Sequence, residues 1–534
     1  MKPIRNAILG IMLAIGATGA ADAQNGIHNP MTQAVLQVYE EELRENPDNY
    51  SVLLMRADEY YRHQEYIRAL ADIDRALTLI PARETENILQ ARMLRAGIHN
   101  QSGRSAEALA DLEAAALLAP ESVSVLLQKG NTEVELGNTA DARADFQKVL
   151  SLTPRSAEAY IGLAKVAVKE NNMGTANEML ASAVNIDPSN PDTYIRRAAV
   201  RKSMGNHNGA VDDLVLALSV NAENPVALSE LVAYGNTNYP AAMAGLSNAV
   251  TAAPQVGLYR YLRAGIAQSH YHYLAALKDY EYIIEQRIYN YHGIYGSIAE
   301  CQFALGRYQE ALASVDRALG MVRDNASYFV LRSRILRVLG KAEEAVAAAA
   351  AALAVDRSSG DALTEMALAY IATGKYDDAD ALLAEAIVGD AEDPRFPMLR
   401  AWLMERFMNN AQGAAQLYRR VADMDHFFID NPKSLKGFAL LFLGEKDQAT
   451  RWMNNILATV DDHDGLIHYF GACFFAQADN TEKALECTRK ALELGYGDYY
   501  DWTDLNDGRI NVGGLRDDLR FLNLLSRHNS IFGR

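Results

Sequence analysis

Hydrophobic residues along most of the chain recur with helical spacing, in short runs that are separated by polar turns. Two series of small residues give this pattern a fixed period of 34 residues between 123 and 222. They are Ala142, Ala176 and Ala210, and Gly130, Ala164 and Ala198. A period of this length predicts an array in which each unit is one pair of helices that stacks on the next pair.

The same frame extends over the rest of the chain and defines thirteen units. The first core position of the second helix is an alanine in every unit: Ala69, Ala108, Ala142, Ala176, Ala210, Ala242, Ala276, Ala311, Ala345, Ala379, Ala414, Ala449 and Ala484. In most units a small residue lies twelve positions earlier, on the first helix: Ala57, Ala96, Gly130, Ala164, Ala198, Ala264, Ala299, Ser333, Ala367, Gly437 and Ala472. Small side chains on facing helices let the backbones approach closely, so a bulky residue there would force the pair apart.

The turn inside each unit is also visible in the sequence. A glycine lies five residues before the alanine in seven units: Gly103, Gly137, Gly205, Gly306, Gly340, Gly374 and Gly444. Glycine is expected just beyond a helix end because it adopts the left-handed conformation without steric cost. Prolines then end several second helices, at Pro81, Pro120, Pro154, Pro188 and Pro254.

This combination of small residue, glycine turn, alanines and proline resembles the tetratricopeptide repeat (TPR) family. The segment MRADEYYRHQEYIRALADIDRALTLIP, Met55 to Pro81, shows most of the pattern in one unit. The resemblance covers residues 50–497 and implies an all-α fold, a right-handed superhelical solenoid of about 13 helix-turn-helix repeats with capping segments at both ends. We expect the caps to be a helix within 24–49 and a loop and helix within 498–534. One unit is longer than the period and the unit at 223–254 is shorter.

The first 23 residues have the pattern of a secretory signal peptide. Lys2 and Arg5 precede a short apolar run, and Ala21 and Ala23 supply the small residues expected around a cleavage point. The apolar run is too short to span a bilayer stably. The sequence therefore predicts a soluble protein that is exported to the periplasm or secreted, with no membrane span.

The net charge of −17 argues against a nucleic-acid-binding protein, which needs a basic stripe. It weakly favours basic partners, although solubility explains an acidic surface equally well. The three cysteines, Cys301, Cys473 and Cys487, are not a disulfide framework. Cys473 and Cys487 belong to the two helices of one unit, so either a bridge between them or buried free thiols is compatible with the sequence.

No motif for catalysis or cofactor binding stands out. The chain lacks a phosphate-binding glycine loop, a serine-hydrolase elbow and the histidine spacing of a zinc protease. The acidic stretches at 461–465 and 501–508 do not have the spacing of a calcium loop. We therefore expect no enzyme, no cofactor, no metal and no small-molecule ligand.

In the TPR family the free face of the first helices lines a concave groove, so the resemblance implies that partners bind there. The candidate residues are Asn131, Lys165, Lys169, Lys202, Tyr261, Arg334 and Arg337. The three lysines form a basic island that suits a carboxylate or an acidic peptide segment, unless they are ordinary exposed lysines. The two arginines lie one unit after Glu300, with which they could pair.

Aromatic residues offer two further hypotheses. Ten of the 27 tyrosines lie between Tyr259 and Tyr308, which indicates either an interface or tight packing between units. Near the C-terminus, Tyr499, Tyr500 and Trp502 either belong to the cap or form a docking surface.

The predicted function is that of an exported, non-catalytic scaffold that binds a protein or peptide partner in the concave groove. One alternative is an envelope polysaccharide-associated binding factor, in which tyrosines stack on sugars. A less favoured alternative is an enzyme with an unrecognised site.

Overall fold

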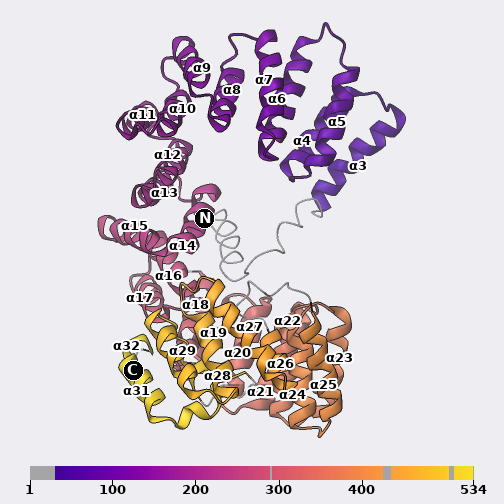
Figure 1. The fold of residues 1–534 in the computed structure, drawn as a ribbon, viewed down its shortest axis with the longest axis vertical. Helices are drawn as coiled ribbons and strands as arrows, with labels where there is room; N and C mark the ends of the chain where they lie inside the picture. Colours follow the sequence, from indigo (N-terminus) through magenta and orange to yellow (C-terminus); the bar gives the residue numbers. More distant parts are fainter. Residues whose placement is uncertain (1–29, 289–290, 425–434, 504–509, 533–534) are drawn as a thin grey trace. The chain divides into compact units, whose positions relative to one another are not determined.

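The structure, a computed structural model, describes residues 30–288, 291–424, 435–503 and 510–532. The predicted signal peptide and Tyr289 lie outside these residues. Every regular element in the described part of the chain is helical. The chain divides into two compact units, of which unit 1 ends at Asn248 and unit 2 begins at Ala249. Each unit is described by itself below (Figure 1).

Unit 1 begins with a single helix, α3, which packs on α4, and continues as consecutive helix pairs. The elements are α3 (Pro30–Glu45), α4 (Tyr50–Arg62), α5 (Tyr66–Leu79), α6 (Thr85–Gln101), α7 (Ser105–Leu118), α8 (Val123–Leu136), α9 (Thr139–Leu152), α10 (Ala157–Lys169), α11 (Met173–Ile186), α12 (Pro191–Ser203), α13 (His207–Val220), α14 (Pro225–Thr237) and α15 (Tyr239–Ala252), which crosses the boundary. Each even-numbered helix from α4 to α14 is the first of its pair, and α4, α6, α8, α10 and α12 each contact the odd-numbered helix that follows.

Unit 2 continues the same order and ends in short elements. Its pairs are α16 (Gly257–Ser269) and α17 (Tyr273–Glu285), α18 (His292–Ala304) and α19 (Tyr308–Met321), α20 (Ala326–Val338) and α21 (Ala342–Val355), α22 (Gly360–Ala372) and α23 (Tyr376–Gly389), α24 (Arg395–Arg406) and α25 (Ala411–Asp423), α26 (Lys436–Phe442) and α27 (Lys446–Thr459), and α28 (Leu466–Gln477) and α29 (Thr481–Glu493). After these come α30 (Tyr499–Trp502), the 3₁₀ helix η2 (Gly513–Asp517), α31 (Leu519–Arg527) and α32 (Asn529–Phe532).

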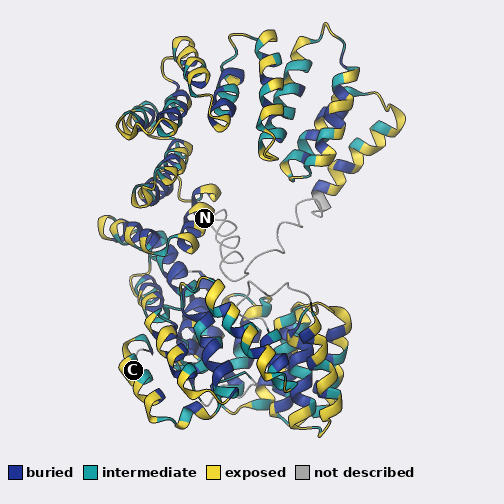
Figure 2. Ribbon diagram, in the orientation of Figure 1, coloured by how far each residue is buried: buried dark blue, intermediate teal, exposed yellow. Residues whose placement is uncertain are grey.

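The thirteen helix pairs from α4 to α29 confirm the predicted all-α solenoid. The thirteen alanines on the second helices are at most 2% exposed. Ala57, Ala164 and Ala299, three of the small residues on the first helices, are also fully buried. Buried residues follow the lines along which paired helices face each other (Figure 2). Small side chains at the crossing therefore let the two backbones approach closely in most pairs.

The turns between paired helices adopt the left-handed conformation that the glycines predicted. Twelve of the thirteen turns have a positive φ five residues before the alanine, and all seven predicted glycines are among them, with φ between 72° and 84°. In the other five turns the position is held by Gln64, Asn171, Tyr271, Asn409 or Asp479. Tyrosine is unusual there, because a bulky residue is strained at positive φ.

A buried ion pair recurs inside five of the helix pairs and was not anticipated. A basic residue precedes the small residue of the first helix, and an aspartate lies three positions after the alanine of the second. The pairs are Arg56–Asp72, Arg95–Asp111, Lys129–Asp145, Arg197–Asp213 and Arg263–Asp279. Arg56 Nε, for example, lies 2.7 Å from Asp72 Oδ2. These aspartates explain how charged side chains are accommodated at the helix crossing.

The last helices of unit 2 return to its first pairs. Helix α32 contacts α17, beside which its label stands in Figure 1, and α30 contacts α18. Trp502 is 1% exposed and its indole N–H donates to the carbonyl of Tyr496, so it belongs to the core of this unit. None of the helices in the described residues combines the length and hydropathy needed to cross a bilayer.

Candidate partner-binding site

Three first helices of unit 1, α8, α10 and α12, stand side by side, with α10 in contact with the other two. Asn131 on α8 and Lys165 on α10 occupy equivalent places in successive units, and their side chains meet. Lys165 Nζ donates a hydrogen bond to Asn131 Oδ1 over 2.9 Å. Asn131 Nδ2 donates to the carbonyl of Leu127 over 2.7 Å, which turns the amide oxygen toward the lysine. The structure thus brings together two of the predicted site residues.

Lys165 is a half-buried cation with no carboxylate partner. No acidic side chain in the described residues lies within ion-pair distance of its Nζ. Burial lowers the pKa of Lys165; Glu135 opposes this shift, whereas Arg196 adds to it. Lys129, one unit earlier, is different because its Nζ lies 2.6 Å from Glu133 and 2.8 Å from Asp145. The unit that holds Lys165 has no such carboxylate, since the recurring ion pair is replaced there by Leu163 and Met179.

The other lysines of the predicted island extend this basic face without touching Lys165. Lys169, at the end of α10, is exposed and has no described partner. Lys202 on α12 is exposed, and its Nζ lies 5.4 Å from the ring centroid of Tyr234 on α14, a cation–π distance. Arg196 is exposed on α12 as well, and its charge reaches Lys165. We call Asn131, Lys165, Lys169, Arg196 and Lys202 the basic face.

The two predicted arginines on α20 are engaged within unit 2. Nε of Arg337 lies 3.1 Å, and Nε of Arg334 3.6 Å, from the carboxylate of Glu365 on α22. Glu300, with which they could pair, accepts a hydrogen bond from Gln268, and the charge of Arg334 also acts on it. Glu365 is 2% exposed, so its carboxylate requires nearby cations, and the arginines one unit earlier supply them.

The remaining candidates in unit 2 are buried. Tyr261 is 3% exposed and packs edge-on against Tyr280, with ring centroids 6.0 Å apart. Cys301, Cys473 and Cys487 are free and buried, so no bridge joins the last two in this structure. Burial raises the pKa of the Cys487 thiol to about 12, which keeps it protonated and unreactive.

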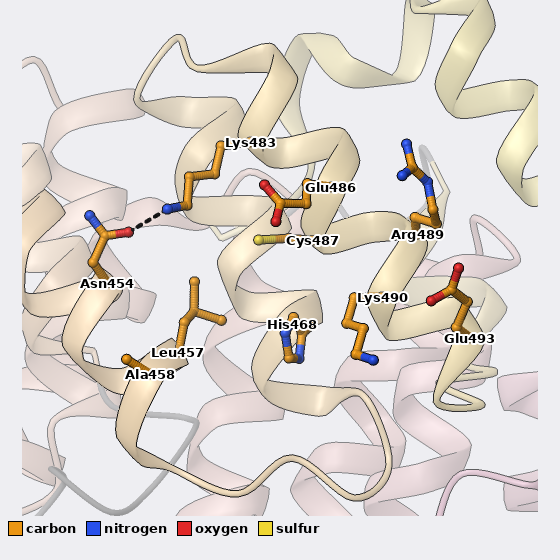
Figure 3. A pocket seen from close by; sticks show the side chains of 10 residues that line it. All are labelled: Asn454, Leu457, Ala458, His468, Lys483, Glu486, Cys487, Arg489, Lys490 and Glu493. Atoms are coloured by element: carbon orange, nitrogen blue, oxygen red, sulfur yellow. Dashed lines mark hydrogen bonds between the residues drawn. The ribbon is translucent and has the colours of Figure 1, made fainter.

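A cavity of about 490 Å³ lies among α27, α28 and α29 (Figure 3). Lys483, Arg489 and Lys490 line it together with Glu486 and Glu493, so the two charge signs largely offset each other. Lys483 is held by Asn454, whose Oδ1 accepts its hydrogen bond over 2.8 Å. No group of three or more metal-ligating side chains is found within the described ranges. The cavity therefore shows less preference for one kind of ligand than the basic face does.

Sequence reasoning missed Arg196 and the recurring buried pairs. A signal for the pairs was present, since a basic residue and an aspartate lie 16 positions apart in five units. Arg196 carries no such signal, because its place on the face of α12 depends on how α10 and α12 pack.

Family models for tetratricopeptide repeats match four stretches of the chain. One model matches residues 133–199 and 339–403, and a second matches 267–327 and 297–362. The chain contains tetratricopeptide repeats. The first of these stretches includes Lys165, Lys169 and Arg196. The basic face therefore lies largely within a matched part of the TPR array.

Several solved TPR structures are similar to parts of the chain. YrrB, whose structure is described as having an unusual peptide-binding site, is 19% identical; the match covers 36% of this chain and 98% of YrrB, with a TM-score of 0.25. Yeast Tom70 is 14% identical over 75% of this chain and 96% of its own, with a TM-score of 0.34. A TPR protein from Parabacteroides merdae is 15% identical over 53% and 97%, with a TM-score of 0.27. No curated protein matches the sequence.

Proposed function

We propose that this protein is an exported, non-catalytic TPR scaffold that binds an acidic segment of a protein partner on the basic face of unit 1. The observation that carries the proposal is Lys165, a half-buried ammonium whose only described partner is the neutral amide of Asn131. Elsewhere in unit 1, the cations buried in the helix pairs have carboxylate partners, as Arg197 has Asp213. A partner's carboxylate would complete the site at Lys165. Export rests on the signal-peptide pattern of residues 1–23.

The chemistry of the basic face fits a carboxylate better than a neutral ligand. A charge-assisted hydrogen bond from a partly desolvated ammonium is stronger than one between neutral groups. Asn131 holds the ammonium in place, which reduces the entropy lost on binding. Lys169, Arg196 and Lys202 are exposed, so each adds little affinity alone but attracts an acidic segment to this face. Because the whole chain is acidic, such a segment would be repelled by most of the remaining surface.

Tyrosine burial in unit 2 weakens the polysaccharide alternative. Five of the tyrosines on which that alternative depends are buried: Tyr259, Tyr261, Tyr280, Tyr291 and Tyr295. Stacking on a sugar requires an exposed ring face, which these side chains do not provide in this structure. A protein partner on unit 1 is therefore the function that the described residues support best.

Replacing Lys165 with methionine is expected to weaken binding of an acidic peptide by about tenfold or more, because one hydrogen bond to a charged group is lost. Binding is measured by fluorescence anisotropy with a labelled hexaglutamate peptide at low salt. The matched control is Lys148→Met, which removes the same charge from an exposed position on the second helix α9. Equal affinities for the two variants, with circular dichroism unchanged, would contradict the proposed site.

A further inference from the structure

The segment from Gly495 to Trp502, here called the closing segment, lies against the first pairs of unit 2. Its Tyr496 ring is 4.8 Å from the ring of Tyr271, and its Tyr500 ring is 5.2 Å from the ring of Phe303. Tyr271 also belongs to the hydrophobic cluster of the last repeats, while Tyr500 packs on the cluster built from α18 to α20. Two separate hydrophobic clusters of unit 2 are therefore joined across this contact.

The backbone of the closing segment fits tightly onto the turn between α16 and α17. Gly495 has a φ of 101°, and a Cβ added to it would lie 2.4 Å from Cε1 of His272. A Cβ at Gly497 would lie 3.0 Å from the carbonyl oxygen of Tyr271. Only glycine allows both the conformation and the close approach at Gly495. The segment is thus shaped to lie on this turn.

Tyr271, in the α16–α17 turn on which the closing segment lies, is an unusual residue for a turn. It has a φ of 60° at the position where seven other turns have glycine. A bulky residue in that conformation is strained, and strain of this kind persists where a side chain is needed for another purpose. Here the ring packs between Tyr273 and Tyr496, at 6.1 and 4.8 Å. We interpret Tyr271 as a docking residue for the closing segment.

Helix α18, which the closing segment contacts through α30, is covered on almost every side. Twelve of its thirteen residues are buried, Glu300 being the exception. In α10, by contrast, the corresponding helix of unit 1, Lys169 is exposed and Lys165 is half-buried. A helix that is buried all round has a partner on every side. The outer face of α18 is therefore an occupied face rather than an unused one.

The closing segment also carries carboxylates that make its docking less than optimal. Asp498 caps α30, accepting a hydrogen bond from the backbone N–H of Tyr500 over 3.0 Å. Burial together with the neighbouring Asp501 raises the pKa of Asp498 well above the ordinary value, although the charge of Arg334 opposes this shift. Asp501 accepts a hydrogen bond from the hydroxyl of Tyr496. Aromatic packing thus holds the segment, while the cost of burying the Asp498 carboxyl beside Asp501 opposes it.

We propose that the closing segment is a ligand bound in cis on the α16–α17 turn and on α18, and that this surface binds a partner's segment of the same chemistry when the closing segment is displaced. The partner segment is extended, with two aromatic side chains that pack on Tyr271 and Phe303 and with carboxylates between and beside them. This site belongs to unit 2 and is independent of Lys165, so the Lys165→Met variant keeps it intact.

The test uses the full chain and a fluorescein-labelled peptide with the sequence of residues 495–503, GYGDYYDWT. Tyr500→Ala removes the ring that packs on Phe303 and loosens the closing segment, so the peptide is expected to bind this variant about tenfold more tightly than the wild type. Adding Phe303→Ala to Tyr500→Ala removes the docking ring and abolishes the gain. The matched control is Tyr376→Ala, which deletes a half-buried tyrosine that stacks on Phe407 instead.

Hydrogen–deuterium exchange distinguishes a bound ligand from a structural cap even if Tyr500→Ala destabilises the protein. Amides of α18 are expected to exchange faster in this variant and to regain protection when the peptide is added. If α18 exchanges faster but the peptide does not bind, and circular dichroism is unchanged, the closing segment is only a structural cap. That result would overturn the proposal. A concentration-dependent dimer of the wild type, formed by exchange of the segment between copies, would overturn it too.

Discussion

Asp213→Ala is expected to lower the free energy of unfolding of unit 1 by about 3–5 kcal/mol, the usual cost of removing one partner of a buried ion pair. Asp213 is 0% exposed and accepts hydrogen bonds from Nε of Arg197 at 2.9 and 3.0 Å. Arg201 Nη1 lies 3.0 Å from the same carboxylate. The substitution leaves two largely buried guanidinium groups without their anion. Denaturant unfolding followed by circular dichroism measures the loss.

The neighbouring residue provides the control for this experiment. Asp212 is exposed, so Asp212→Ala removes the same charge and is expected to change the free energy of unfolding by less than about 0.5 kcal/mol. Replacing Asp213 and Arg197 together with apolar residues is expected to cost less than Asp213→Ala alone, because fewer charges remain unpaired. Equal effects of the two single alanine substitutions would show that the buried pair does not stabilise the helix crossing.

Phe146→Ala is also expected to cost about 3–5 kcal/mol, through the cavity it leaves in unit 1. The Phe146 ring is fully buried on α9 and lies between two glycines of neighbouring first helices. A Cβ added to Gly130 on α8 would lie 2.9 Å from the ring, and one added to Gly162 on α10 would lie 2.4 Å from it. The ring fills the space that these glycines leave. The same unfolding measurement applies.

A double-mutant cycle measures how strongly the Phe146 ring and Gly162 are coupled. Gly162→Ala alone is expected to destabilise unit 1 because its Cβ collides with Phe146, but in the Phe146→Ala background it is expected to be neutral or stabilising. Gly174→Ala, on the adjacent second helix, meets nothing closer than 3.7 Å and serves as the control. Additive effects of Gly162→Ala and Phe146→Ala would contradict the packing described here.

The features that could be predicted from the sequence are those enforced within one 34-residue unit. An alanine such as Ala176 must be small because the partner helix lies directly against it, and Gly137 must adopt positive φ because α8 ends there. Each unit repeats these local requirements, so the 34-residue period predicts where the helix pairs and their turns lie. For the same reason thirteen pairs were found where thirteen alanines predicted them.

Features that depend on contacts between units could be predicted less well. Arg337 pairs with Glu365 one unit later, a choice that the period alone does not decide. The packing of Tyr500 on Phe303 depends on small rotations that accumulate over several repeats, so no local pattern marks it. Lys165 and Asn131 could be placed on one face, yet only the structure shows that the lysine lacks a carboxylate.

Hydrogen–deuterium exchange of the wild-type chain with the hexaglutamate peptide tests the proposed partner site most directly. The peptide is expected to protect amides of the first helices α8, α10 and α12, around Lys165, and to leave the second helices α9, α11 and α13 unchanged. Protection confined to the second helices or to unit 2, or its persistence in Lys165→Met, would contradict the claim that the basic face is where an acidic partner binds.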